Sequence, residues 1–127
     1  LFSGDALFRF GCGRIFEGTY DEMKRSLNKI EKLDDSINVY CGHEYTIHNL
    51  KFLKGIFHND KMLDKIEQDI LKQIKNTKTS MPFNLGNEKK FNPFLSLKSP
   101  TYKNFMERKG FGSIEMFRYL RDLRNDY

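Results

Sequence analysis

The order in which strand-like and helix-like stretches follow one another is the feature that most restricts the fold of this chain of 127 residues. Up to residue 45, short apolar stretches typical of strands flank one amphipathic helix, which the spacing of apolar residues predicts over residues 20–33. From residue 46 onward, almost every apolar residue recurs at helical spacing. A part with a sheet, followed by a helical part, predicts an α+β fold divided after Tyr45 into residues 1–45 and residues 46–127.

Helical periodicity predicts several further helices in the second part. They cover residues 47–57, 63–74, 100–109 and 113–124. Between them, residues 76–90 are polar and are interrupted by proline and glycine, which indicates a surface loop. The turn over residues 91–94 follows this loop, and its two aromatic residues are expected to anchor the loop in the core.

Two predicted strands end in residues that can bind a metal ion or move a proton. The first strand runs into Asp5, and the second, over residues 37–41, runs into His43. A carboxylate and an imidazole at neighbouring strand ends suit a metal site or an acid/base pair. A catalytic zinc ion usually has three protein ligands, so the two residues are too few by themselves. His48 and His58 are assigned to the surface, because His48 would lie on a helix about a turn and a half beyond His43.

The formal net charge is +5, and residues 89–127 carry all of it, with nine Lys or Arg against four Asp or Glu. A basic face of this kind attracts anions, or it serves only as a solubilising surface. On the last predicted helix, Arg118, Arg121 and Arg124 stand three residues apart and so lie along one side. Such a row can bind carboxylates through paired hydrogen bonds, or it can be a solvated face near the helix end.

No apolar run approaches the roughly 20 residues that span a bilayer, and the start of the chain lacks the features of a signal peptide. The chain also begins without methionine, inside a stretch typical of a strand, so we expect a fragment whose beginning is missing. Cys12 and Cys41 form no CxxC pair and are expected to be free thiols, which favours a reducing compartment. We therefore expect a cytoplasmic protein, with a mitochondrial location as the alternative.

Four segments of the chain carry a recognisable pattern of residues. They are Ser3-Gly4-Asp5-Ala6-Leu7-Phe8, Gly11-Cys12-Gly13-Arg14-Ile15-Phe16-Glu17-Gly18-Thr19, Cys41-Gly42-His43-Glu44-Tyr45-Thr46 and Asn92-Pro93-Phe94. In order and spacing these segments resemble the second half of the hydroxyacylglutathione hydrolases, the glyoxalase II family. The resemblance implies the C-terminal half of a metallo-β-lactamase αββα sandwich followed by a helical domain. Residues 1–45 would end the sandwich, and residues 46–127 would form the helical domain that binds the substrate.

The resemblance implies a thioester hydrolase that converts S-D-lactoylglutathione to D-lactate and glutathione, with a hydroxide bound to two divalent metal ions. The metals would be zinc, with iron or manganese as alternatives. Asp5 matches the carboxylate that bridges both metals, and His43 matches a ligand of the second metal. The other ligands of the family lie upstream, in a Thr-His-x-His-x-Asp-His motif and one further histidine, and none of them occurs here. We therefore expect the fragment alone to be inactive.

The resemblance also implies which residues contact glutathione. They are Arg14, Phe16, Tyr45, Arg121 and Arg124. Many family members have tyrosine at the position of Phe16, so a hydroxyl contact is expected to be lost. Arg124 replaces a lysine, which keeps the charge but changes its geometry. The implied partner is a small-molecule glutathione thioester, bound by a monomer that contacts neither nucleic acid nor a membrane.

Two other functions are open alternatives. A persulfide dioxygenase with one iron has the same fold and related motifs, whereas residues 41–45, the turn at residues 17–19 and the pair Arg121 and Arg124 favour the hydrolase. A non-catalytic module that binds anions through its basic helices is the alternative from another class. Assays with lactoylglutathione, glutathione persulfide and nucleic acid would distinguish the three functions.

Overall fold

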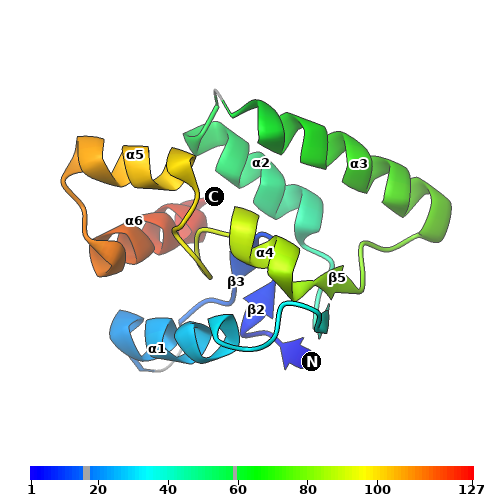
Figure 1. Ribbon diagram of the computed structural model, residues 1–127, viewed down its shortest axis with the longest axis horizontal. Helices are drawn as coiled ribbons and strands as arrows, with labels where there is room; N and C mark the ends of the chain where they lie inside the picture. Colours follow the sequence, from blue (N-terminus) through cyan, green and yellow to red (C-terminus); the bar gives the residue numbers. More distant parts are fainter. Residues whose placement is uncertain (16–17, 59) are drawn as a thin grey trace.

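The computed structural model describes residues 1–15, 18–58 and 60–127. In these residues helices predominate and short strands form small sheets, which confirms the predicted α+β class (Figure 1). The strands are β1 (Phe2–Gly4), β2 (Leu7–Phe8), β3 (Gly11–Cys12), β4 (Asn38–Cys41) and β5 (Phe83–Asn84). The helices are α1 (Tyr20–Glu31), α2 (Thr46–Ile56), α3 (Lys61–Thr77), α4 (Leu85–Phe91), α5 (Pro100–Lys109) and α6 (Ser113–Asp126). No helix within the described ranges has both the length and the apolar character needed to cross a membrane.

Strands β1, β4 and β5 form a sheet in which β4 is the central strand. β1 runs parallel to β4, with Gly4 opposite Cys41, and β5 runs antiparallel to β4. β2 and β3 form a separate antiparallel pair soon after β1. Because two parallel strands end at the same edge of their sheet, the segments that follow β1 and β4 meet there. This edge carries Asp5 and His43.

The predicted helices are confirmed, and local capping signals explain where two of them begin. The hydroxyl of Thr19 accepts a hydrogen bond from the N–H of Glu22 at 3.2 Å and caps α1. The carboxylate of Asp60 accepts one from the N–H of Met62 at 2.9 Å and caps α3. α2 and α3 lie side by side and run in opposite directions, and α1 packs against α6 (Figure 1).

The prediction of a surface loop over residues 76–90 is wrong for its second half. β5 and α4 lie there, and Phe83 pairs with Val39 of the central strand. The side chain of Asn84 accepts a hydrogen bond from the N–H of Asn87 at 2.9 Å and so caps α4. A strand of 2 residues and a helix of 7 residues are too short for periodicity to reveal them.

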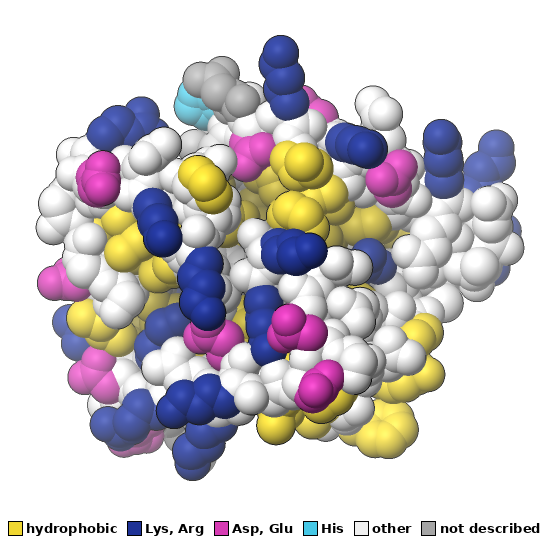
Figure 2. All heavy atoms as spheres, in the orientation of Figure 1, with side chains coloured by type: hydrophobic (Ala, Val, Ile, Leu, Met, Phe, Trp, Pro, Cys, Tyr) yellow, Lys and Arg dark blue, Asp and Glu magenta, His cyan; other side chains and the backbone are white. Residues whose placement is uncertain are grey.

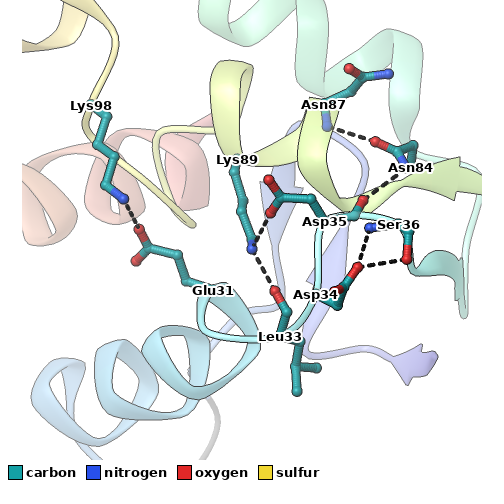
Figure 3. A network of polar contacts seen from close by, with 9 residues as sticks. All are labelled: Glu31, Leu33, Asp34, Asp35, Ser36, Asn84, Asn87, Lys89 and Lys98. Atoms are coloured by element: carbon teal, nitrogen blue, oxygen red, sulfur yellow. Dashed lines mark hydrogen bonds and ion pairs between the residues drawn. The ribbon is translucent and has the colours of Figure 1, made fainter.

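Polar contacts fasten α4 to the turn between α1 and β4 (Figure 3). Lys89 Nζ donates to Leu33 O and to Asp35 Oδ1, both at 2.6 Å. Asn84 Nδ2 donates to Asp35 O at 2.9 Å. These contacts, together with the pairing of β5 with β4, connect the segments on either side of Tyr45. The domain boundary after that residue stays a prediction.

The core is one cluster that draws on both parts of the chain. Its buried members include Leu7, Leu27, Val39, Leu50, Leu53, Phe94, Phe117 and Leu120. The presence of Phe94 in it confirms that the turn at residues 91–94 is anchored in the core. Cys12 is a buried free thiol and Cys41 a half-buried one, as predicted. On the face drawn in Figure 2, Lys and Arg side chains are spread among Asp and Glu and do not gather in one basic patch.

A buried carboxylate and a buried amide hold the turn between β2 and β3. Glu88 is 2% exposed, and its Oε1 accepts hydrogen bonds from the N–H of Phe10 and from Asn92 Nδ2. Asn92 also donates to the carbonyl oxygens of Phe8 at 3.3 Å and Gly11 at 3.1 Å. Phe10 has a φ of 62°, a left-handed conformation that is unfavourable for a bulky residue, so the turn depends on these partners.

Replacing Glu88 with glutamine is expected to remove a loss of stability that occurs as the pH rises from about 4.5 to about 7. Burial raises the pKa of Glu88 from 4.5 to about 7. Between these two values the native state holds the proton that the unfolded chain has released, so the free energy of unfolding falls as the pH rises. Above about pH 7 the variant is expected to be more stable than the parent by roughly 2 kcal/mol, and near pH 5 the two are expected to differ little.

Urea unfolding at the two pH values measures this difference. The exposed Glu107 provides the matched control, because Glu107→Gln removes a carboxylate of the same kind from the surface. A Glu88→Gln variant that loses stability with pH as steeply as the parent does would contradict the prediction.

Candidate functional site

The edge where β1 and β4 end carries Asp5 and His43 side by side. His43 Nε2 lies 3.4 Å from Asp5 Oδ1, and the two side chains are 50% and 71% exposed. The N–H of Gly42 donates to Gly4 O at 2.7 Å, which joins the two strand ends. A β-carbon at residue 42 would lie 2.5 Å from Asp5 Oδ1, so any larger residue there would displace the carboxylate from its present position. The carboxylate and the imidazole therefore meet, and their role as metal ligands stays a prediction.

An aromatic stack fixes the orientation of the His43 imidazole. The ring of Tyr45 lies nearly parallel to it, with centroids 4.9 Å apart and an angle of 11° between the planes. The same tyrosine ring meets the ring of Phe8 edge-on, with centroids 5.0 Å apart. Phe8 is buried and gives the stack a fixed base, whereas Tyr45 is exposed. Tyr45, a predicted substrate contact, thus supports the histidine and remains accessible.

Hydrogen bonds to the carboxylate of Glu44 hold the turn between β4 and α2 in place. Its carboxylate accepts hydrogen bonds from the Ser80 N–H at 2.5 Å and from the hydroxyls of Ser80 and Thr46, both at 2.6 Å. Burial would raise the pKa of Glu44, but these hydrogen bonds outweigh burial and bring the pKa below its usual value. The ionised carboxylate therefore ties the turn that carries His43 to the segment before β5.

A cavity of about 840 Å³ opens beside Asp5 and His43. It is lined by Asp5, Phe8, Cys12, Gly13, Arg14, His43, Tyr45, His48, Asn49, Arg121, Arg124 and Tyr127. The fold therefore brings the predicted metal ligands and the predicted substrate contacts to one cavity, within the part of the chain that the structure describes. Phe16, the remaining predicted contact, lies outside the described residues.

Arg14, Arg121 and Arg124 form a cationic wall of the cavity, and Arg121 is its buried member. Its Nη1 donates to Cys12 O at 2.7 Å and to Gly13 O at 3.1 Å, which joins α6 to the end of β3. Its guanidinium carbon lies 5.6 Å from the centroid of the Phe94 ring. Its Nε is buried and has no hydrogen-bond partner among the described residues. Arg121 therefore supports the turn that carries Arg14, besides adding positive charge to the cavity.

Arg124 is half-buried one turn further along α6. Its Nε donates to Asn49 Oδ1 at 3.2 Å, and its guanidinium carbon lies 5.9 Å from the centroid of the Tyr127 ring. Burial, followed by the guanidinium groups of Arg121 and Arg14, lowers the pKa of Arg124. Three guanidinium groups thus act on one another across the cavity, and an anion bound there would relieve their repulsion.

Most of the chain matches a known protein family. The family model described as "Hydroxyacylglutathione hydrolase C-terminus" matches residues 44–127. The chain belongs to this family. Proteins named hydroxyacylglutathione hydrolase are similar to it in Rhodopseudomonas palustris (strain BisB18), with 40% identity over 125 residues, and in Bartonella tribocorum, with 40% identity over 128 residues. A third, from Crocosphaera subtropica, is 44% identical over 100 residues.

The matches cover much more of this chain than of the relatives. They include 98%, 100% and 79% of the chain, but 49%, 50% and 39% of the proteins from Rhodopseudomonas, Bartonella and Crocosphaera, respectively. The chain therefore spans about half the length of the relatives that it matches, and it corresponds to their C-terminal half.

The described part of the chain offers two suitable metal donors at the cavity. A carboxylate and an imidazole suit zinc, iron or manganese, and the side chains of Asp5 and His43 are open to the cavity. Within residues 1–15, 18–58 and 60–127, no three of His, Cys, Asp and Glu lie close enough together to hold an ion. The pair therefore fits part of a metal site that would need further ligands.

Sequence reasoning missed six residues that line the cavity, namely Phe8, Cys12, Gly13, His48, Asn49 and Tyr127. His48 is exposed, as predicted, but it also lines the cavity, with its ring centroid 4.9 Å from that of Tyr127. Asn49 is buried and binds Arg124. A signal for His48 existed, because it follows Tyr45 by three residues at the start of a helix and so lies on the same side. Tyr127 carries no comparable signal in the sequence.

Proposed function

We propose that this chain is the C-terminal half of an enzyme that hydrolyses S-D-lactoylglutathione to D-lactate and glutathione. The observation that carries the proposal is the pairing of Asp5 with His43, 3.4 Å apart, in a cavity that three arginines also line. A glutathione thioester combines a hydrolysable acyl–sulfur bond with two carboxylates, so it matches both features of the cavity. The names of the relatives support a hydroxyacylglutathione as the substrate.

The proposed fold of the complete enzyme is the metallo-β-lactamase sandwich. Residues 1–45 would complete the sandwich, and residues 46–127 would form the helical substrate-binding domain. An exposed aromatic pair on the sheet supports this arrangement. Phe2 is 85% exposed, and its ring centroid lies 5.5 Å from that of Tyr40 across the β1–β4 pair. Exposed apolar surface of this kind marks a contact region, and the rest of the sandwich would cover it.

Asp5 and His43 would hold two divalent metal ions together with ligands from the other half of the enzyme. Zinc is the expected metal, with iron or manganese as alternatives. Such ions would supply Lewis-acid polarisation of the thioester carbonyl and a water molecule of lowered pKa. The stack on Tyr45 would keep the imidazole of His43 in one orientation toward the cavity, and the hydrogen bonds of Glu44 would keep the turn in place.

The cationic wall would orient the substrate. Arg14 and Arg124 line the cavity, while Arg121 supports the turn before Arg14 through its bonds to Cys12 O and Gly13 O. Guanidinium groups bind carboxylates through paired hydrogen bonds, which restricts the position of the glutathione part. A fixed glutathione part places the acyl–sulfur bond in one position for attack by water, and hydrolysis then releases a carboxylic acid and a thiol.

Replacing Gly42 with alanine in the complete enzyme is expected to lower kcat/KM for S-D-lactoylglutathione by about tenfold or more. The new β-carbon would lie 2.5 Å from Asp5 Oδ1 and 3.1 Å from Gly4 O, so the carboxylate must move away from His43. Metal content, measured by mass spectrometry of the purified enzyme, is expected to fall in parallel. Gly55 provides the matched control, because a β-carbon there meets nothing within 4 Å and alanine favours the helix.

Three outcomes would contradict the proposal. Equal hydrolysis by the Gly42→Ala and Gly55→Ala variants would show that hydrolysis does not need Asp5 to be held beside His43. An enzyme that consumes oxygen with glutathione persulfide, but leaves lactoylglutathione intact, would be a persulfide dioxygenase. Binding to nucleic acid that weakens steeply with salt, without either activity, would indicate an anion-binding module.

A further inference from the structure

His48 is held at the wall of the cavity by aromatic contacts. It belongs to the first turn of α2 and lines the same cavity as Asp5 and His43. Its ring centroid lies 4.9 Å from that of Tyr127, and the Tyr127 ring meets the ring of Phe52 edge-on at 5.4 Å. Because Phe52 is buried in the core, this chain of contacts connects the imidazole to a rigid part of the fold.

The charged groups around His48 make its surroundings positive. Burial, followed by the positive charges of Arg124 on α6 and Lys51 on α2, lowers the pKa of His48. The ring of Tyr127 also packs against the imidazole, with centroids 4.9 Å apart. The free site therefore favours a neutral imidazole, and a negative charge placed between His48 and Arg124 would reverse that preference.

We propose that His48 and Arg124 together bind a carboxylate of the glutathione thioester, and that the imidazole takes up a proton as this carboxylate binds. The inference rests on the proposed function for the identity of the ligand. Arg124 is oriented by its bond from Nε to Asn49 Oδ1 at 3.2 Å. Its guanidinium carbon lies 5.9 Å from the centroid of the same Tyr127 ring that the His48 imidazole contacts, and both residues line the cavity. A carboxylate between two cations accepts charge-assisted hydrogen bonds from both of them.

Proton uptake makes ligand binding dependent on pH in a defined direction. The imidazole binds its proton more strongly in the complex than in the free enzyme. The affinity for the ligand therefore rises as the pH falls through the interval between the two pKa values of His48, that of the complex and that of the free enzyme. A nearby opposite charge shifts the pKa of a titrating group by about one unit or more. A shift of one pKa unit corresponds to a change of about tenfold in the affinity for the ligand. His48 would thereby act as a binding residue that selects ligands with a carboxylate at this end of the cavity.

Isothermal titration calorimetry of the complete enzyme with S-methylglutathione tests this inference. This ligand is a thioether, so it carries both carboxylates but is not hydrolysed. For the parent, Kd is expected to be about five- to tenfold lower at pH 6 than at pH 8, and titrations in buffers of different ionisation enthalpy are expected to show proton uptake. His48→Asn is expected to abolish both effects, because an amide does not titrate. His58→Asn is the matched control at another exposed histidine, which does not line this cavity.

Equal pH dependence and equal proton uptake in His48→Asn and the parent would overturn the inference. An enzyme that hydrolyses lactoylglutathione but binds S-methylglutathione independently of His48 would uphold the proposed function and refute the inference. An enzyme that does not hydrolyse the thioester, yet binds S-methylglutathione with proton uptake that requires His48, would uphold the inference and refute the proposed function. With the hydrolase, His48→Asn is further expected to raise KM for lactoylglutathione several-fold near pH 6 and to change kcat less than about twofold.

Discussion

Replacing Arg121 with alanine is expected to lower the free energy of unfolding by about 3 kcal/mol. The side chain is 2% exposed, and its Nη1 donates to Cys12 O at 2.7 Å and to Gly13 O at 3.1 Å. Alanine would leave both carbonyl oxygens without this donor and would open a void beside the ring of Phe94. Urea unfolding followed by circular dichroism measures the loss.

Arg118 is the matched control for this experiment. It lies on the same helix, but its side chain is 53% exposed and its contact with Asp21 is 3.9 Å long. Arg118→Ala is therefore expected to change the free energy of unfolding by less than about 0.5 kcal/mol. Arg121→Lys is expected to fall between the two alanine variants, because one ammonium group replaces a planar group with several donors. A loss for Arg121→Ala as small as that for Arg118→Ala would show that Arg121 does not support the fold.

Replacing Asn92 with aspartate is expected to lower the free energy of unfolding by about 4 kcal/mol near neutral pH. Asn92 is 0% exposed, and its Nδ2 donates to Phe8 O, Gly11 O and Glu88 Oε1 at 3.3, 3.1 and 2.8 Å. A carboxylate oxygen at the position of Nδ2 would face three oxygen atoms and offer none of them a hydrogen. The volume of the side chain hardly changes, so the effect isolates the lost donor and the buried charge.

Asn87→Asp is the matched control, because it makes the same chemical change on the exposed side of α4. A negative charge in the first turn of a helix is slightly favourable, so this variant is expected to stay within about 0.5 kcal/mol of the parent. Both variants are compared by urea unfolding at the same pH. An Asn92→Asp variant as stable as Asn87→Asp would rule out the proposed dependence of the β2–β3 turn on the Asn92 amide.

Local sequence patterns predicted the long helices because their signals repeat over several turns. The capping pattern that begins at Thr19 and the apolar stripe after Asp60 both specify a helix without reference to the rest of the chain. α4 escaped prediction for the opposite reason. Its short length offers no periodicity, and contacts from distant residues, such as the Asp35 turn with Lys89, stabilise it.

The candidate site was partly predictable. Asp5 and His43 each follow a stretch typical of a strand, so their types and positions suggested a shared edge, and the parallel pairing of β1 with β4 confirms that they meet. The row of arginines on α6 was visible as a pattern. Which of them is buried was not visible, because the burial of Arg121 depends on the approach of β3, more than 100 residues earlier in the chain.

The sequence by itself determined the fold class, the longer helices, the family and the residue types available for chemistry, because each of these depends on short-range spacing or on a recognisable motif. The tertiary structure alone decided that Arg121 serves the backbone of residues 12 and 13, that Asn92 and Glu88 hold the β2–β3 turn, and that His48 faces the cavity. These outcomes rest on contacts between segments far apart in the chain. The residue type determines which groups a side chain can bind, and tertiary packing determines which of those groups lies within reach of the side chain.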